Sequence, residues 1–221
     1  MLTTEEPLTE LSPGEFYFPY NLDPAEVPEF EAIRDIESGI VAIVGAVGTG
    51  RTHLLQRFVD YHKTQGRKVL NIAYNHNELQ GIDTFVFDTE SVRNADRTVS
   101  LVKARTMLAR IEAVAPDVVI MDDLNYAETT ALAVMLAKKG IAVFSTMYGS
   151  RNDSALYHIE RRLEEVEDIG AFDNPNNLVK GLIQITRNDE ILHPDPLARR
   201  HNSKTKFIAK VETPGTDTGT L

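Results

Sequence analysis

The stretch Gly45-Ala46-Val47-Gly48-Thr49-Gly50-Arg51-Thr52 decides how the rest of this 221-residue chain is interpreted. It follows an apolar run at residues 40–44 and precedes a helical pattern that starts near His53. A buried strand, a glycine-rich loop and a helix N-terminus in this order form a cradle for a phosphate group, because the loop N–H groups and the positive end of the helix dipole point at one anion. The spacing matches the phosphate-binding loop G-x-x-x-x-G-K-[ST] except at the lysine, which is Arg51 here.

The loop predicts a nucleotide site with defined contacts. The backbone N–H groups of residues 48–52 are expected to hold the β-phosphate of ATP, and the Thr52 hydroxyl is expected to bind Mg²⁺. The residues predicted to bind the nucleotide are Gly45, Gly48, Thr49, Gly50, Arg51 and Thr52. The alternative is a glycine-rich turn that binds no ligand.

Composition limits the class of protein. With 42% apolar and 25% charged residues, a chain of 221 residues is long enough to bury one full core. It has no cysteine, which excludes disulfides and thiolate metal sites. No apolar run approaches the roughly 18 residues that a membrane span needs, and residues 1–10 lack the basic and apolar regions of a signal peptide. We therefore expect a cytoplasmic protein with no membrane insertion.

The negative charge of the chain is concentrated at one end. Residues 1–40 hold ten Asp and Glu against Arg34 alone, which accounts for −9 of the formal net charge of −10. This segment is either a solvated acidic surface or a docking surface for a basic partner or a neighbouring subunit. The basic residues between Arg199 and Lys210 are expected on an exposed strand edge, so nucleic acid is not an expected partner.

Apolar runs and helical stripes alternate along the rest of the chain. Strands are predicted at residues 40–44, 68–73, 84–87, 118–121 and 141–145, with amphipathic helices between most of them. This alternation predicts an α/β fold with a mainly parallel sheet and helices on both faces. Beyond residue 180, short strands at 182–186, 190–192 and 206–211 predict an antiparallel C-terminal extension.

The predicted organisation is one domain with two short appendages. An acidic, proline-rich arm spans 1–38, the domain spans 39–212, and a disordered tail spans 213–221. A short helix is expected within residues 25–37. The aromatic patch formed by Phe16, Tyr17, Phe18 and Tyr20 is expected to pack onto the domain.

A second motif follows the predicted strand at 118–121. Asp122-Asp123 stands at the carboxyl end of an apolar run, as the acidic residues of a Walker B motif do. Asp122 is expected to orient the hydration shell of Mg²⁺, and Asp123 to polarise the attacking water. The alternative role of such an aspartate is to cap a following helix. Thr146 follows the neighbouring predicted strand and is a candidate sensor of the γ-phosphate, or else an ordinary strand-end hydroxyl.

Three segments after residue 115 stand at a characteristic spacing. They are Pro116-Asp117-Val118-Val119-Ile120-Met121-Asp122-Asp123-Leu124, Ala127-Glu128-Thr129-Thr130-Ala131-Leu132-Ala133 and Gly140-Ile141-Ala142-Val143-Phe144-Ser145-Thr146. With these segments, residues 39–187 resemble the ATPase domain of the type II/type IV secretion and pilus extension–retraction motors, a RecA-like P-loop NTPase family. The resemblance implies ATP and Mg²⁺ as ligands and a homo-oligomeric ring such as a hexamer. It also implies a protein partner in a secretion or pilus machine at the inner membrane's cytoplasmic face.

The chain departs from that family at several motif positions. Arg51 replaces the Walker A lysine, Asp122-Asp123 replaces the Walker B Gly-Glu, and Tyr148 stands where the family has its sensing histidine. Of the acidic box Glu78 remains, at the position that the family uses as general base, and residues 79–92 contain none of the arginines that reach a neighbouring subunit. The resemblance thus implies Glu78, Asp123 and Arg51 as catalytic residues and Tyr148 as a nucleotide contact. Residues 1–38 are too short for the family's N-terminal domain, which we expect to be missing.

These departures leave three functions open. Arginine keeps the charge of lysine but has a bulkier planar fork, and losing one well-placed contact costs about 2–4 kcal/mol, or roughly 10²–10³ in rate. The first function is a slow or degenerate ATPase that acts in a ring on a protein partner. The second is a non-hydrolysing pseudo-ATPase subunit or an inhibitor of such a motor. The third is a DNA-handling P-loop ATPase, such as a helicase loader or packaging motor, which the charge distribution disfavours.

Overall fold

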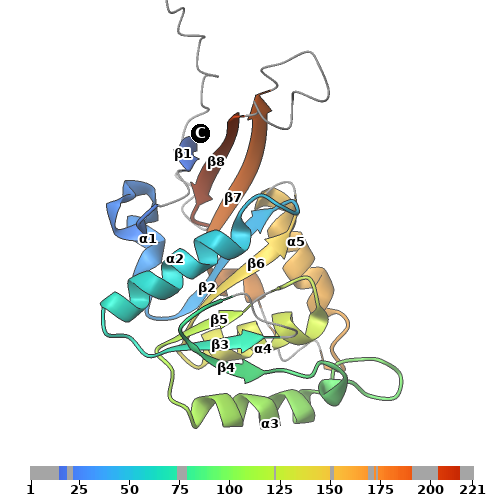
Figure 1. Ribbon diagram of the computed structural model, residues 1–221. Coiled ribbons are helices and arrows are strands. Elements are labelled where there is room, and N and C mark those ends of the chain that lie inside the picture. The colour runs from blue at the N-terminus through green and yellow to red at the C-terminus, as the bar shows by residue number, and fades with distance from the viewer. Residues whose placement is uncertain are drawn as a thin grey trace, which may run out of the picture.

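The computed structural model contains eight strands that form one sheet (Figure 1). The strands are β1 (Glu15–Phe18), β2 (Gly39–Gly45), β3 (Val69–Ala73), β4 (Asp83–Val86), β5 (Val118–Met121), β6 (Ala142–Tyr148), β7 (Val179–Glu190) and β8 (Lys204–Glu212). Their order across the sheet is β1-β8-β7-β2-β6-β5-β3-β4. The structure describes residues 15–18, 22–73, 79–121, 123–149, 152–168, 172, 174–190 and 204–214, and all statements below concern these residues.

The centre of the sheet is parallel, which confirms the prediction from the alternating pattern. The strands β7, β2, β6, β5, β3 and β4 lie side by side and run in one direction. Beyond them, β8 pairs antiparallel with β7, and β1 pairs antiparallel with β8. The predicted antiparallel extension is therefore present, and it begins at β8.

The strand β7 differs from the prediction of two short strands with a turn between them. It continues without a break from Val179 to Glu190. Its register with β8 runs from Leu182 opposite Glu212 to Glu190 opposite Lys204. A continuous ladder satisfies the backbone N–H and C=O groups of a polar stretch whose composition suggested a turn. Residues 191–192 lie outside the described part of the chain.

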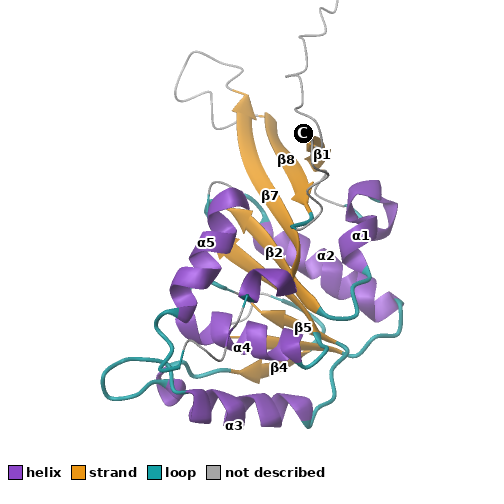
Figure 2. Cartoon of the chain, turned by 180° about the vertical axis from the view of Figure 1, so that it is seen from behind, coloured by secondary structure: helices purple, strands orange, loops and turns teal. Residues whose placement is uncertain are grey.

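Helices cover both faces of the sheet (Figure 2). The α-helices are α1 (Glu31–Arg34), α2 (Arg51–Thr64), α3 (Leu101–Glu112), α4 (Ala127–Lys138) and α5 (Asn152–Leu163). The short 3₁₀ helices are η1 (Pro24–Glu26), η2 (Pro28–Phe30), η3 (Glu90–Val92) and η5 (Pro175–Leu178). The apolar residues of α2 pack on one face, and those of α3, α4 and α5 pack on the other. The predicted helical stripes are thus confirmed.

The alternation of side chains along β2 shows how the sheet separates two cores. Val41 and Ile43 belong to the core under α2, whereas Ile40, Ala42 and Val44 belong to the core under α3, α4 and α5. All five side chains are at most 1% exposed. A strand that is buried on both faces appears in the sequence as a continuous apolar run, and this is why residues 40–44 could be predicted as a strand.

The segment before β2 is part of the core under α2. Phe30 and Ile33 are fully buried there, and the Phe30 and Phe58 rings lie 5.4 Å apart. The contact is tight, because a Cβ built on Gly181 would stand 2.6 Å from Ile33 Cγ2. The predicted short helix within residues 25–37 is confirmed by η1, η2 and α1. Residues 215–221 of the predicted tail lie outside the described part.

Candidate functional site

The predicted phosphate-binding loop connects the carboxyl end of β2 to the first turn of α2. Its backbone takes positive φ at Gly48 (79°) and Gly50 (89°), a conformation that favours glycine. Gly50 is the residue before the helix, and the Leu54 N–H donates to the Gly50 carbonyl over 2.9 Å to close the first turn. The first N–H groups of a helix have no carbonyl partner within it. The loop therefore presents donors at the place where the sequence predicts an anion.

The loop is also packed closely at its start. A Cβ on Gly45 would stand 2.5 Å from Thr49 Oγ1 and 2.9 Å from the Ile185 carbonyl oxygen, so β2 tolerates no side chain there. The Thr49 hydroxyl donates to the Ala46 carbonyl over 2.9 Å, and Thr49 is 4% exposed. Thr49 thus holds the shape of the loop with its side chain. The Arg51 Cδ would lie 3.5 Å from the same Cβ, so the Arg51 side chain folds back toward the loop start.

The strand β6 lies beside β2 and places two predicted residues near the loop. Tyr148 stands opposite Gly45 in the register and is 57% exposed, whereas Thr146 stands opposite Ile43 and is 4% exposed. The Gly149 N–H donates to the Gly45 carbonyl over 3.3 Å, which fixes the end of β6 to the start of the loop. Thr146 and Tyr148 therefore both lie close to the loop. Tyr148 is the nearer of the two and the more exposed.

Asp123 follows β5 and takes part in the turn that begins α4. Its Oδ1 accepts a hydrogen bond from the Asn125 backbone N–H at 2.8 Å and another from the Asn125 side-chain amide. Its carbonyl accepts from the Thr129 hydroxyl. These contacts give Asp123 a turn-forming role close to the capping alternative. Its predicted role on water stays a prediction, and so do those of Asp122 and Glu78, which lie outside the described residues.

The end of β5 is connected to β6 through the backbone. The Leu124 N–H donates to the Thr146 carbonyl over 2.9 Å. Since β6 lies between β5 and β2, this bond links the residue after Asp123 to the strand that flanks the loop. The structure thus brings the loop, Thr146, Tyr148 and Asp123 to the carboxyl ends of three consecutive strands, where open parallel sheets bind their ligands.

A cavity of about 640 Å³ begins at the loop and runs along α2. Thr52, His53 and Gln56 line it on α2, and residues 79–81 line the opposite side. Gln56 holds that loop with two hydrogen bonds, accepting from the Gln80 N–H at 2.8 Å and donating to the Gln80 carbonyl at 3.3 Å. The Lys63 ammonium donates to the Gly81 carbonyl at 2.5 Å. Thr52 therefore faces an open space, and its metal-binding role stays a prediction.

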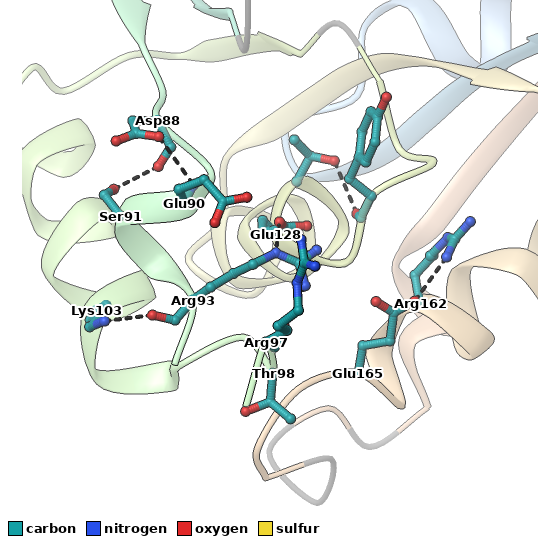
Figure 3. A network of polar contacts seen from close by, with 12 residues as sticks. Asp88, Glu90, Ser91, Arg93, Arg97, Thr98, Lys103, Glu128, Arg162 and Glu165 are labelled. Carbon is teal, nitrogen blue, oxygen red and sulfur yellow. Dashed lines mark hydrogen bonds and ion pairs between the residues drawn. The ribbon is translucent and has the colours of Figure 1, made fainter. Parts of the chain in front are cut away.

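Sequence reasoning did not identify a buried ion pair near the N-terminus of α4. Figure 3 shows the Arg93 side chain reaching Glu128, with Arg97 beside them. Arg93 Nε lies 2.5 Å from Glu128 Oε1, and Glu128 is 3% exposed. The hydrogen bond that Arg93 donates to Glu128 raises the pKa of the Arg93 guanidinium, against the opposing effect of burial. Arg93 thus follows directly after residues 79–92, and its side chain pairs with Glu128 of the same chain. The sequence feature that could have drawn attention to Glu128 is its place in the Ala127-Glu128-Thr129 segment, which belongs to the resemblance described above.

The described part of the chain lacks two further features. None of its helices is long and apolar enough to cross a membrane. Within the same residues, no three His, Cys, Asp or Glu side chains are grouped so that they could hold a metal ion by themselves. Mg²⁺ at a phosphate-binding loop needs few protein ligands, because nucleotide phosphates supply the others. The two protein ligands predicted for Mg²⁺ are the Thr52 hydroxyl and Asp122, and this small number is enough when nucleotide phosphates supply the other ligands.

Comparison with solved structures assigns the fold. The ATPase DotB of Yersinia pseudotuberculosis matches with a TM-score of 0.60 and 14% identity, over 89% of this chain and 49% of DotB. The pilus retraction motor PilT with bound ADP matches with a TM-score of 0.55 and 16% identity, over 89% of this chain and 56% of PilT. DotB of Legionella pneumophila matches with a TM-score of 0.50 and 22% identity, over 73% of this chain and 44% of that protein. This chain therefore has the RecA-like fold of type IV secretion and pilus motor ATPases.

The chain spans about half the length of the solved structures that it matches. A scan against models of protein families finds no match, and a search of curated proteins finds none. The predicted resemblance to secretion and pilus motors is thus confirmed at the level of structure.

Proposed function

We propose that this chain binds ATP with Mg²⁺ at residues 45–52 and acts as a slow or degenerate ATPase in a ring of identical subunits. The observation that carries the proposal is the closely packed loop between β2 and α2. Its glycines adopt conformations that free several N–H groups, and a Cβ on Gly45 has no space. Together with the helix dipole of α2, this arrangement favours a bound phosphate.

The identity of Arg51 is the reason to propose slow turnover. A lysine ammonium is a compact charge, whereas a guanidinium is planar and longer, so the exchange is not conservative at a tight phosphate site. Binding through the backbone donors does not depend on this side chain. Stabilisation of the transition state does, and its loss costs about 10²–10³ in rate. In this proposal Thr52 and Asp122 hold Mg²⁺, and Asp123 and Glu78 act on the attacking water.

The second candidate is a non-hydrolysing subunit or inhibitor of a secretion or pilus motor. One specific observation favours it: Asp123 Oδ1 is held by both Asn125 donors, so the carboxylate that would polarise water is already engaged in a turn. The exposed Tyr148 beside Gly45 adds to this, because it stands where the family has its sensing histidine.

The experiment measures ATP binding and ATP turnover in the wild type and in three variants. A turnover that Asp123→Ala abolishes supports the enzyme, and Arg51→Lys is expected to raise the rate. Asn125→Ala is the matched control, since it removes the side-chain donor to Asp123 but keeps the backbone donor and the carboxylate. Binding without turnover in the wild type, with turnover restored by Arg51→Lys, supports the second candidate. A wild type that binds no nucleotide contradicts both.

We further propose that the ring acts on a protein partner of a secretion or pilus machine at a cytoplasmic membrane surface. This part rests on the fold that the chain shares with DotB and PilT. Pull-down of the tagged chain from the producing cell, with Thr52→Ala as the control, tests whether a partner binds in a nucleotide-dependent way.

A further inference from the structure

A cavity of about 540 Å³ lies at the first turn of α4, around the ion pair of Arg93 and Glu128. Figure 3 shows Glu90, Arg97 and Glu165 near this pair. The walls come from four parts of the chain, which are η3, the loop before α3, the start of α4 and the segment that follows α5. This volume is in the range of small-ligand sites, and the cavity shares no residue with the phosphate-binding loop.

One carboxylate oxygen of Glu128 is buried in the wall of this cavity without a hydrogen-bond donor. Its Oε1 accepts from Arg93 Nε at 2.5 Å, whereas its Oε2 has no hydrogen-bond partner among the described residues. Glu128 is 3% exposed, so bulk water does not supply the missing donor. A buried acceptor without a donor costs free energy, and folded proteins satisfy nearly all such groups. Glu128 Oε2 therefore marks a place where a donor is needed.

The charges that line the cavity favour a cationic donor. The acidic lining residues are Glu90, Asp96, Glu128 and Glu165, and the basic ones are Arg93 and Arg97. Arg162 Nη1 lies 2.8 Å from Glu165 Oε1 and neutralises it, which leaves three carboxylates against two guanidinium groups. Asp96 stays ionised at neutral pH, because the Thr98 hydroxyl and the Thr98 N–H both donate to it and lower its pKa. The cavity therefore keeps an excess of negative charge.

The walls of the cavity are held in place by contacts outside it. Asn94 Nδ2 donates to Glu167 Oε2 at 2.7 Å, and the Val99 N–H donates to the carbonyl of residue 165 at 3.0 Å. The Lys103 ammonium of α3 donates to the Arg93 carbonyl at 2.6 Å. These bonds fix residues 93–99 to α3 and to the segment after α5. A ligand thus meets a site whose walls are already ordered, which lowers the entropic cost of binding.

The geometry at Glu128 favours an ammonium over a guanidinium. Arg93 already occupies Oε1, so a second guanidinium could not pair with both oxygens of this carboxylate. An ammonium is a compact charge that needs one acceptor and little space beside a shielded oxygen. Tyr126, which is 41% exposed, also lines the cavity and offers its ring to the methylene groups of an alkylamine.

We propose that this cavity binds a primary ammonium group, carried by a small amine or by a lysine side chain, which donates a hydrogen bond to Glu128 Oε2. The contact supplies the missing donor and offsets the excess negative charge of the walls. It goes beyond the function proposed above and requires no nucleotide. The site is adjacent to the turn at Asp123, because the Thr129 hydroxyl, one residue after Glu128, donates to the Asp123 carbonyl.

The test is an isothermal titration of the full-length chain at low salt with two probes, putrescine and N-acetyl-lysine methylamide. The variant Glu128→Gln keeps an oxygen for Arg93 Nε and places an NH₂ donor where Oε2 stood. The control, Glu29→Gln, makes the same charge change on η2, whose Phe30 packs in the core under α2, on the other face of the sheet from α4. Thermal melts show whether each variant is folded.

The wild type is expected to bind at least one probe saturably at one site per chain. Glu128→Gln is expected to weaken this binding at least about tenfold, and Glu29→Gln to leave it unchanged. Tighter binding of putrescine assigns the site to a small amine, and tighter binding of the lysine derivative assigns it to a lysine side chain. Absence of saturable binding of either probe overturns the proposal. Equal weakening by the two variants also overturns it, because it would show general attraction to a chain with a net charge of −10.

A second measurement locates the site in the wild type and decides the question even if Glu128→Gln does not fold. Amide resonances of the ¹⁵N-labelled chain are followed during the same titrations. Shifts confined to residues 93–98 and 126–128 are expected, whereas shifts centred on the acidic residues 23–37 would overturn the proposal. Both measurements are made without nucleotide, so their outcome is distinct from that of the nucleotide site.

Discussion

Lowering the pH from 7.5 to 5.0 is expected to destabilise this fold through His62, a buried histidine of α2. The ring is 0% exposed and lies 4.8 Å from the Phe144 ring centre. Its Nδ1 is 3.4 Å from Arg67 Nη1, and its Nε2 has no hydrogen-bond partner among the described residues. Burial, and then the charge of Arg67, lower the pKa of His62 from 6.5 to about 4.

The sign and size of the effect follow from this pKa. Above pH 6.5 the ring is neutral in both the folded and the unfolded state, so it adds no pH dependence. Between pH 6.5 and 4 the unfolded chain takes up a proton that the folded chain refuses, and the free energy of unfolding falls as the pH falls. Between pH 7.5 and 5.0 this difference is about 2 kcal/mol, and it approaches ~3 kcal/mol near pH 4.

Urea unfolding at pH 7.5 and pH 5.0 measures the effect. The variant His62→Phe keeps an aromatic ring next to Phe58 and Phe144 but does not titrate. Other titrating groups affect both proteins equally, so the wild type is expected to lose about 2 kcal/mol more than the variant over this interval. Equal losses in the two proteins would refute the reasoning, because they would show that His62 is protonated without cost in the folded state.

Three further substitutions have expected outcomes. Gly45→Ala places a Cβ 2.9 Å from the Ile185 carbonyl oxygen, so calorimetry is expected to show ATP binding weakened by at least about tenfold; unchanged affinity contradicts the tight cradle. Glu128→Ala leaves the Arg93 guanidinium without its buried carboxylate and is expected to cost about 3–5 kcal/mol in urea unfolding, against a smaller loss for Glu128→Gln. Gln56→Ala removes both hydrogen bonds to Gln80 and is expected to speed hydrogen exchange at the Gln80 amide, at a cost of about 1 kcal/mol in stability.

The elements that sequence reasoning identified are those with a local signal. The features concerned are the apolar run before Gly45, the glycine pattern of the loop and the helical stripe of α2. Each of them is defined by residues that are close together in the sequence, and the structure confirms the strand, the loop and the helix. Gly140, with φ of 85°, follows the end of α4 at Lys138 in a backbone conformation that favours glycine. Local spacing is sufficient for these features because the periodicity of an element follows from its own geometry.

The features that sequence reasoning missed depend on partners far along the chain. The pairing of Arg93 with Glu128 spans 35 positions, and the burial of His62 on α2 depends on Phe144 of strand β6. The length of β7 is set by its ladder with β8 rather than by its polar composition. Asp123 shows a different limit, since the strand-end aspartate of a catalytic site and that of a turn have the same sequence, and the contacts to Asn125 reveal the turn.

The most direct test of the account is an isothermal titration of the wild-type chain with ATP in the presence of Mg²⁺, repeated with Thr52→Ala. The account predicts saturable binding of one nucleotide per chain, independent of turnover, and at least about tenfold weaker binding by the variant, since Thr52 lies at the first turn of α2. Absence of saturable binding by the wild type, or binding that Thr52→Ala leaves unchanged, contradicts the claim that residues 45–52 hold a nucleotide.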